Sequence, residues 1–151
     1  MLEKTGEMTR KKALLIVAVA AAAILLTVWA VHASREKQRN AATAQERVAF
    51  LDELGWTVDP ESESAQTVLI PDCGEGAMAD YNALMLSAGY DLNPFSGKSV
   101  EQYCYEILNY PGYTGSVTAV LYVHDGRVIG GDIHTAALNG FMHELRKNPQ
   151  S

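Results

Sequence analysis

The chain has 151 residues, enough for one domain of ordinary size, and its 12 Lys and Arg against 18 Asp and Glu give a net charge of −6. The charge is unevenly distributed, because from Val48 onward four cations stand against 14 anions. Such an acidic segment lacks the cations that displace counterions from a phosphate backbone, which excludes nucleic acid as a partner. Two Cys and four His are too few for a disulfide scaffold or a dense zinc cluster.

The clearest pattern lies near the N-terminus. Residues 13–31 form a run of 19 residues without a charge, in which Thr27 is the single hydroxyl-bearing side chain. A helix of this length spans roughly 28 Å, close to the ~30 Å hydrocarbon core of a bilayer. The run has no polar face, unlike a helix on the surface of a soluble domain. We therefore predict a single transmembrane helix over residues 13–31, with the lipid bilayer as its partner.

The orientation of this helix follows from its flanking cations. Four cations lie on each side, but Arg10, Lys11 and Lys12 are contiguous and adjoin the apolar run. We therefore expect residues 1–12 to be a cytoplasmic tail and the folded part to lie outside the cell membrane, behind an uncleaved signal-anchor. The alternative is a signal peptide cleaved near Ala33, which would release a secreted protein, although the apolar run is longer than a typical signal core.

Residues 32–44 are polar and alanine-rich and are expected to extend the membrane helix as a helical stalk, followed by a domain over residues 45–147. The apolar spacing of residues 47–54 predicts the first helix of that domain, ended by Gly55. Residues 56–59 are expected to form a short strand, residues 60–64 an acidic mobile loop and residues 67–70 a second strand.

Asp72 and Glu75 have the spacing of a capping box, which predicts a helix over residues 77–88. After an ordered loop over residues 90–98, strands are predicted over residues 100–108, 117–124 and 128–133. The pair Asp125-Gly126 is the typical signal of a two-residue hairpin, and pairing His124 with Arg127 would place Tyr122 opposite Ile129 and Leu121 opposite Gly130.

Thr135 is expected to cap a last helix, whose apolar stripe would comprise Leu138, Phe141, Met142 and Leu145. The predicted fold class is α+β. It consists of an N-terminal transmembrane helix and a small domain with an antiparallel sheet, built from a three-stranded meander plus one or two strands, and about three helices.

Several short motifs resemble a bacterial family of small membrane-anchored proteins known as domain of unknown function 4830. The resemblance covers Gly55 to Leu145 and rests on Gly55-Trp56, Val58-Asp59-Pro60, Tyr81-Asn82, residues 89–92, Gly97-Lys98, Tyr103, Tyr105, residues 109–111, residues 125–133 and residues 139–143. The resemblance implies a membrane helix before the domain. It implies no activity, substrate or cofactor.

Candidate chemistry is sparse. Asp132 and His134 would share one strand face, and His143 lies nine residues further on the predicted last helix. Their spacing matches no recognised metal signature, so we expect neither a catalytic site, nor a metal site, nor a cofactor. Cys73 and Cys104 are expected to be buried free thiols, although a disulfide between them stays open outside a membrane.

The second feature that suggests a binding surface is a concentration of tyrosines, because five of the seven lie between residues 90 and 113. Aromatic rings are common at binding surfaces, so weak binding candidates are Tyr103, Tyr105 and Tyr110. Three further weak candidates are Asp132, His134 and His143. The competing interpretation is a half-buried sheet face covered by the loop over residues 90–98.

The sequence thus favours a non-enzymatic binding or protein-interaction module, held outside the membrane, that meets an unidentified protein or envelope ligand. The alternative is a small envelope enzyme or metal-binding protein that uses Asp132, His134 and His143.

Overall fold

The computed structural model describes residues 10–37 and 39–146, and the chain divides into two units after Gln38. The first unit contains the helix α1 (Arg10–Lys37). The second contains two helices, a 3₁₀ turn and five strands: α2 (Ala44–Glu53), β1 (Val58–Leu69), α3 (Gly76–Ser87), η1 (Asn93–Phe95), β2 (Ser99–Ile107), β3 (Thr118–His124), β4 (Arg127–His134) and β5 (Met142–Glu144). Most of the expected tail, residues 1–9, and the expected domain end at Lys147 lie outside the described residues.

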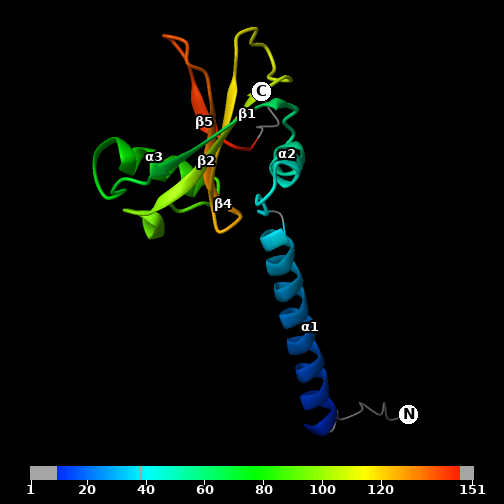
Figure 1. Ribbon diagram of the computed structural model, residues 1–151. Coiled ribbons are helices and arrows are strands. Elements are labelled where there is room, and N and C mark those ends of the chain that lie inside the picture. The colour runs from blue at the N-terminus through cyan, green and yellow to red at the C-terminus, as the bar shows by residue number, and fades with distance from the viewer. Residues whose placement is uncertain (1–9, 38, 147–151) are drawn as a thin grey trace. The chain divides into compact units, whose positions relative to one another are not determined.

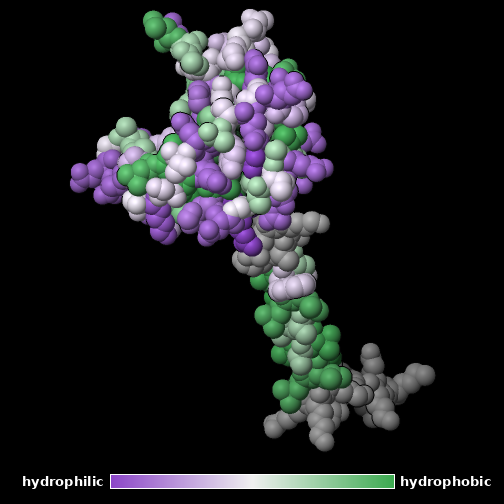
Figure 2. All heavy atoms as spheres, in the orientation of Figure 1, coloured by the Kyte–Doolittle hydropathy of each residue, from purple (hydrophilic) through white to green (hydrophobic). Residues whose placement is uncertain are grey.

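α1 includes the whole apolar run over residues 13–31. Its side chains are described for residues 14–30, where the large apolar ones are 55–70 % exposed, and Figure 2 shows a hydrophobic surface along this helix. Among the helices of the described residues, none combines the length and the hydropathy of a membrane span. A helix at this place is confirmed, and a transmembrane segment stays a prediction.

The expected helical stalk over residues 32–44 differs from the structure. α1 ends at Lys37, and the segment after it joins the domain. The Val128 N–H donates to the Arg39 carbonyl and the Ala41 N–H to the Gly126 carbonyl, each at 2.8 Å. Thr43 then caps α2 in a capping box with Glu46, which starts a separate helix.

The sheet is antiparallel, with its strands in the order β1-β2-β3-β4-β5 (Figure 1). Each strand pairs with the next one along the chain, so the predicted meander and the α+β class are confirmed. α2 and α3 lie on opposite sides of the sheet (Figure 1). One face, which we call the α2 face, carries Tyr105, Leu121 and Ile133, and the other, the α3 face, carries Tyr122 and Asp132.

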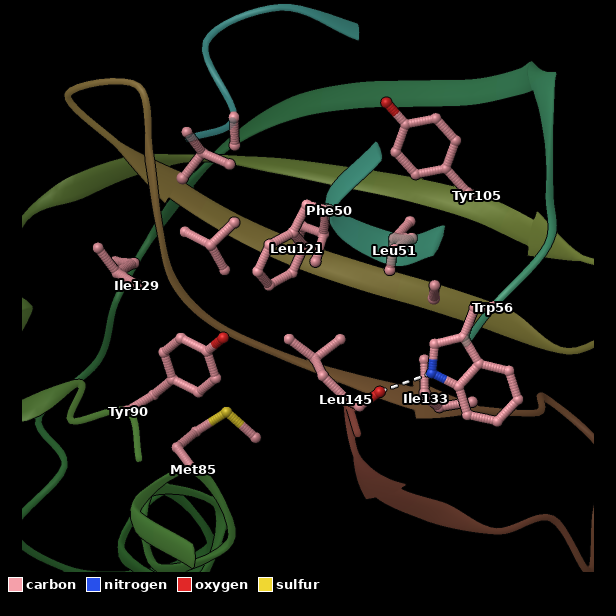
Figure 3. Close-up of a cluster of buried hydrophobic side chains, with 14 of the residues drawn as sticks. Phe50, Leu51, Trp56, Met85, Tyr90, Tyr105, Leu121, Ile129, Ile133 and Leu145 are labelled. Atoms are coloured by element: carbon pink, nitrogen blue, oxygen red, sulfur yellow. Dashed lines mark hydrogen bonds between the residues drawn. The ribbon is translucent and has the colours of Figure 1, made fainter. Parts of the chain in front are cut away.

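The core lies chiefly between α2 and the sheet (Figure 3). α2 ends as predicted, because Gly55 adopts a positive φ of 94° and the Trp56 N–H returns to the Leu51 carbonyl at 2.9 Å. This closure turns the Trp56 ring into the core, where its indole N–H donates to the Leu145 carbonyl at 2.6 Å. Phe50 and Leu51 are 4 % and 0 % exposed beside it.

The prediction of a mobile loop over residues 60–64 is wrong, because β1 continues through these residues. Its pairing with β2 is irregular between Asp59 and Ser64, where four residues of β1 pass the single residue Tyr105. The buried Arg47 of α2 holds Glu63 with two hydrogen bonds of 3.0 Å, which fixes this acidic stretch against the domain. A partner from outside the strand thus overrides the local loop signal.

The hairpin turn at Asp125-Gly126 is confirmed, with φ values of 50° and 71°. His124 pairs with Arg127 as predicted, and Val123 pairs with Val128, but the register shifts at Ile129. Tyr122 therefore pairs with Gly130 and Leu121 with Gly131, so the two predicted pairs are wrong by one residue. A β-bulge of this kind leaves no sign in the alternation of apolar residues when both faces are covered.

The helix predicted over residues 77–88 is confirmed as α3, but its predicted cap and the predicted last helix are wrong. The Asp72 side chain accepts a hydrogen bond from the Gly74 N–H rather than capping a helix, and α3 begins after Glu75 without a side-chain cap. The predicted last helix does not exist among the described residues, because the segment after Thr135 turns back into β5. There Thr135 N–H donates to the Phe141 carbonyl, and Leu138 is fully exposed at the loop tip.

Candidate functional site

The structure distributes the predicted site residues over three places. Tyr103 and Tyr105 share the α2 face of β2, as predicted, but α2 rather than the loop over residues 90–98 covers them. Tyr105 is 1 % exposed, accepts a hydrogen bond from the Arg47 Nε at 3.0 Å and donates one to Glu63. The Arg47 guanidinium lies 3.6 Å above the Tyr103 ring.

The cluster formed by Arg47, Glu63, Tyr103 and Tyr105 holds the buried positive charge of the Arg47 guanidinium. Burial lowers the pKa of Arg47, but hydrogen bonds to Tyr105 and Glu63 outweigh it, so the pKa lies above its ordinary value. Burial and the bond to Glu63 raise the pKa of Tyr105 to about 12. Arg47 also donates to the Ala41 carbonyl at 2.9 Å. The arrangement joins α2, β1 and β2, and its polar groups form hydrogen bonds with one another.

Tyr110 and His143 meet at a second place, at the end of the sheet beside Trp56. The Tyr110 ring is parallel to the Trp56 ring at 5.6 Å between centroids and stacks on Phe141 at 4.7 Å. The Tyr110 hydroxyl lies 3.0 Å from the His143 Nε2, and burial raises the pKa of Tyr110. This aromatic cluster is half-buried and extends the core toward the surface.

Asp132 and His134 form the third place, on the α3 face. Asp132 is 2 % exposed, and its two carboxylate oxygens have separate partners. The Tyr81 hydroxyl of α3 donates to Oδ2 at 2.5 Å, and the His134 Nδ1 lies 2.7 Å from Oδ1. Burial, followed by the nearby charge of Asp132, raises the pKa of Tyr81 well above its ordinary value.

His143 does not join Asp132 and His134. It pairs with Ile133, and because neighbouring residues of a strand point to opposite faces, its ring lies on the α2 face. The three-residue site of the enzyme or metal alternative is therefore split between two faces. Within the described ranges 10–37 and 39–146, no group of three His, Cys, Asp or Glu side chains could hold a metal ion.

The two cysteines are free thiols rather than a disulfide. Cys73 is buried, and Cys104 is partly buried in the middle of β2. Burial is the largest cause that raises the pKa of Cys104. A thiol with a raised pKa holds little thiolate at neutral pH, so Cys104 is a poor nucleophile.

A groove opens on the α3 face beside the third place. We call it the β1–α3 groove; it encloses about 280 Å³ and is lined by Val68, Leu69, Ile70, Pro71, Met78, Tyr81, Leu92, Gln102 and Tyr122. Most of the lining is apolar, with three convergent polar side chains. This mixture is typical of binding sites, in which apolar walls supply contact area and a few polar groups fix orientation.

The polar side chains of the groove belong to one hydrogen-bonded network. Gln66 donates to Gln102, whose amide donates to the Tyr122 hydroxyl at 3.3 Å. The Tyr122 and Tyr81 rings meet edge to face at 6.3 Å, and Tyr81 continues to Asp132. Burial raises the pKa of Tyr122, so it stays a neutral donor and acceptor. The network holds the groove's polar groups in fixed positions.

Sequence reasoning missed Tyr81, Tyr122 and Gln102 as site residues. Tyr122 and Gln102 lie on alternate positions of their strands, on the face that carries Asp132, so strand pairing combined with alternation could have grouped them. Tyr81 comes from α3, and no sequence signal shows which sheet face that helix covers.

A second groove, of about 440 Å³, runs along α2 and the start of β1. It is lined by Ala44, Gln45, Val48, Ala49, Asp52, Trp56, Thr57, Val58 and Pro60. Its walls are mainly short apolar side chains and contain no network of polar side chains like that of the β1–α3 groove.

Comparison with known proteins gives one match. The family described as domain of unknown function (DUF4830) matches residues 50–133, which run from within α2 to Ile133 in β4. The match contains Tyr103, Tyr105, Tyr110 and Asp132, but Arg47, His134 and His143 lie outside it. No curated protein and no solved structure matches the chain. Since the match spans more than half of the 151 residues, the chain belongs to the DUF4830 family.

Proposed function

We propose that this chain is a single-pass membrane protein that presents its acidic domain outside the cell and binds another protein there without catalysing a reaction. The observation that carries the binding role is the β1–α3 groove, in which apolar walls surround the positioned polar groups of Gln102, Tyr122 and Tyr81. Leu69 stands at its rim and is 62 % exposed, which provides an apolar contact for a partner.

The anchoring role is supported by the uncharged run over residues 13–31 and by the exposed apolar side chains of α1. Transfer of such a surface out of water is favourable by a free energy of roughly 25 cal/mol per Å², so an apolar environment would stabilise it strongly. The contiguous cations Arg10, Lys11 and Lys12 favour a cytoplasmic N-terminus. The domain would then face the outside, where it would meet envelope proteins.

Site-specific photo-crosslinking in cells tests the binding role. A photoreactive amino acid replaces Leu69 at the groove or Leu108 after β2, both of which are 62 % exposed in the intact chain. We expect a discrete adduct with one protein from position 69 and none from position 108. Val68→Glu, which puts a charge into the groove wall, should abolish the adduct. Equal adducts from both positions, or none from position 69, would contradict the proposal.

A further inference from the structure

The two edges of the sheet differ in how they are protected. An edge strand exposes unpaired N–H and C=O groups that can pair with another chain, and proteins usually blunt such edges by shortness, charge, proline or bulges. β5, at one edge, has three residues and is short. At the other edge, the first part of β1 contains Pro60, Glu61, Glu63 and an irregular pairing.

The second part of β1 carries none of these protections. Residues 64–69 contain no charge and no proline, and they pair regularly with residues 99–104 of β2. In the part of the chain that the structure describes, no strand pairs with their other side. All of these residues except the half-buried Val68 are exposed, so nothing described covers the edge. Within residues 10–37 and 39–146, six residues of β1 are therefore open to pairing.

This open edge adjoins the β1–α3 groove. Val68 and Leu69 belong to both, and Ile70 and Pro71 continue the groove wall directly after the edge. Val68 lies on the α3 face because it pairs with Val100, at an alternate position from Gln102. A strand added along residues 64–69 would place every second side chain on that face, next to Val68 and the apolar wall.

Charge selects the kind of partner. Residues 39–146 contain 5 Lys and Arg against 15 Asp and Glu, a net charge of −10. Near the groove, the exposed Asp72, Glu75 and Asp80 follow Pro71, whereas Lys98 is the cation beside Ile70. An acidic surface attracts a cationic segment and repels a second copy of the same domain.

We propose that residues 64–69 of β1 bind an extended cationic segment of another protein as a sixth strand of the sheet. Backbone hydrogen bonds to the edge would supply affinity, and an apolar side chain in the β1–α3 groove would supply selectivity. This inference rests on the proposed binding function and specifies its partner as a basic, alternating strand.

Hydrogen exchange on the full-length chain in detergent micelles tests the proposal. The probes are three octapeptides in which Lys alternates with Val, Leu or Phe, and each has a matched peptide N-methylated at every second amide. We expect at least one unmethylated peptide to bind and to slow exchange of amides within residues 64–69, with affinity falling as salt rises. Its N-methylated form should not bind, because it lacks the N–H donors on the side that would pair with β1.

A matched pair of variants sharpens the test. Thr67→Lys adds a cation at the centre of the edge, opposite Glu101, whereas Thr114→Lys makes the same change in the exposed β2–β3 loop. Thr67→Lys should weaken peptide binding about tenfold or more through like-charge repulsion, and Thr114→Lys should leave it within about twofold.

Three results would overturn the inference: no binding by any peptide, binding without protection of residues 64–69, or equal binding by an N-methylated peptide. Protection of residues 64–69 in concentrated protein without peptide would identify a second copy as the occupant and overturn it too. If the Leu69 adduct persists in cells after such a result, the proposed function stands and the sixth strand alone fails.

Discussion

Gly130 and Gly131 are adjacent in β4, but their surroundings differ. A Cβ on Gly131 would lie 2.1 Å from the Val120 carbonyl oxygen, a backbone atom of the paired strand. A Cβ on Gly130 would lie 3.0 Å from the Leu92 Cδ2, at the end of a flexible side chain. The first contact cannot relax without moving the sheet, and the second can relax by a small side-chain shift.

We therefore expect Gly131→Ala to destabilise the domain more than Gly130→Ala. Overpacking costs roughly 1–3 kcal/mol, and Gly131→Ala should lie at or above the top of that range while Gly130→Ala lies near the bottom. Urea denaturation followed by circular dichroism measures both free energies of unfolding. Equal losses would show that the register shift at Ile129 is misplaced.

Tyr105 links stability to pH. Its pKa rises from the ordinary value of 10.0 to about 12 in the folded protein, so the folded state holds the phenolic proton more tightly than the unfolded state. This stabilisation is complete below pH 10 and is lost as the pH rises toward 12. Two pKa units correspond to about 2–3 kcal/mol.

Tyr105→Phe should consequently flatten the loss of stability between pH 10 and 12, although it lowers stability at neutral pH by removing two hydrogen bonds. The measurement is a series of urea denaturation curves across that pH range. Tyr113→Phe is the control, because Tyr113 lies in the loop after β2 and contacts Thr135 instead of the Arg47 cluster. An unchanged alkaline slope in Tyr105→Phe would contradict the account.

At the scale of elements, α2 depends on its own start signal. The Thr43 hydroxyl accepts from the Glu46 N–H at 3.2 Å, and the Glu46 carboxylate accepts from the Thr43 N–H at 3.0 Å. Thr43→Ala should cost about 0.5–2 kcal/mol of unfolding free energy, the usual range for a lost N-cap. Thr114→Ala in an exposed loop is the matched control. A loss no greater than the control's would show that α2 is fixed by Arg47 alone.

The elements that were predictable are those with local signals. Gly55 ends α2, Asp125-Gly126 turns the hairpin, and the β-branched and aromatic runs mark β2, β3 and β4. Each depends on backbone conformation or alternation within a few residues. The α+β class followed from these elements and needed no long-range information.

The errors have long-range causes. The stripe of Leu138, Phe141, Met142 and Leu145 fits a helix by spacing, yet Leu145 is 1 % exposed and Leu138 fully exposed, because the segment folds back as β5. A strand of three residues is too short to show alternation. The acidic residues after Pro60 became strand because Arg47 pairs with Glu63, 16 residues away.

The candidate site was only partly predictable for the same reason. The prediction that Asp132 and His134 share one face is confirmed, whereas His143, predicted on a helix, lies on the other face of the sheet. The groove needs α3 packed against β4, where Tyr81 reaches Asp132 across 51 positions of the sequence. Nothing in the sequence around Tyr81 specifies that contact.

For the whole molecule, the boundary of the folded unit can be tested directly. Ala41 is fully buried, and backbone hydrogen bonds join Arg39 and Ala41 to the β3–β4 hairpin. A fragment of residues 39–146 should therefore unfold cooperatively. A fragment of residues 44–146 should be less stable by at least about 2 kcal/mol, because it loses two backbone hydrogen bonds, the Thr43 cap of α2 and the buried Ala41. Urea denaturation compares them. Equal stability would show that residues 39–43 contribute nothing to the fold.

The proposed function requires that the chain presents its domain on the outer side of a membrane, where the groove and the open edge of β1 would meet envelope proteins. The most direct test treats intact, wall-stripped cells with a membrane-impermeant protease and follows fragments of residues 39–146. A known outer-face protein and a cytoplasmic protein serve as controls. We predict digestion of the domain together with the outer-face control, and loss of that orientation when Arg10, Lys11 and Lys12 are replaced by Gln. A domain that stays protected while the outer-face control is cleaved would contradict the account.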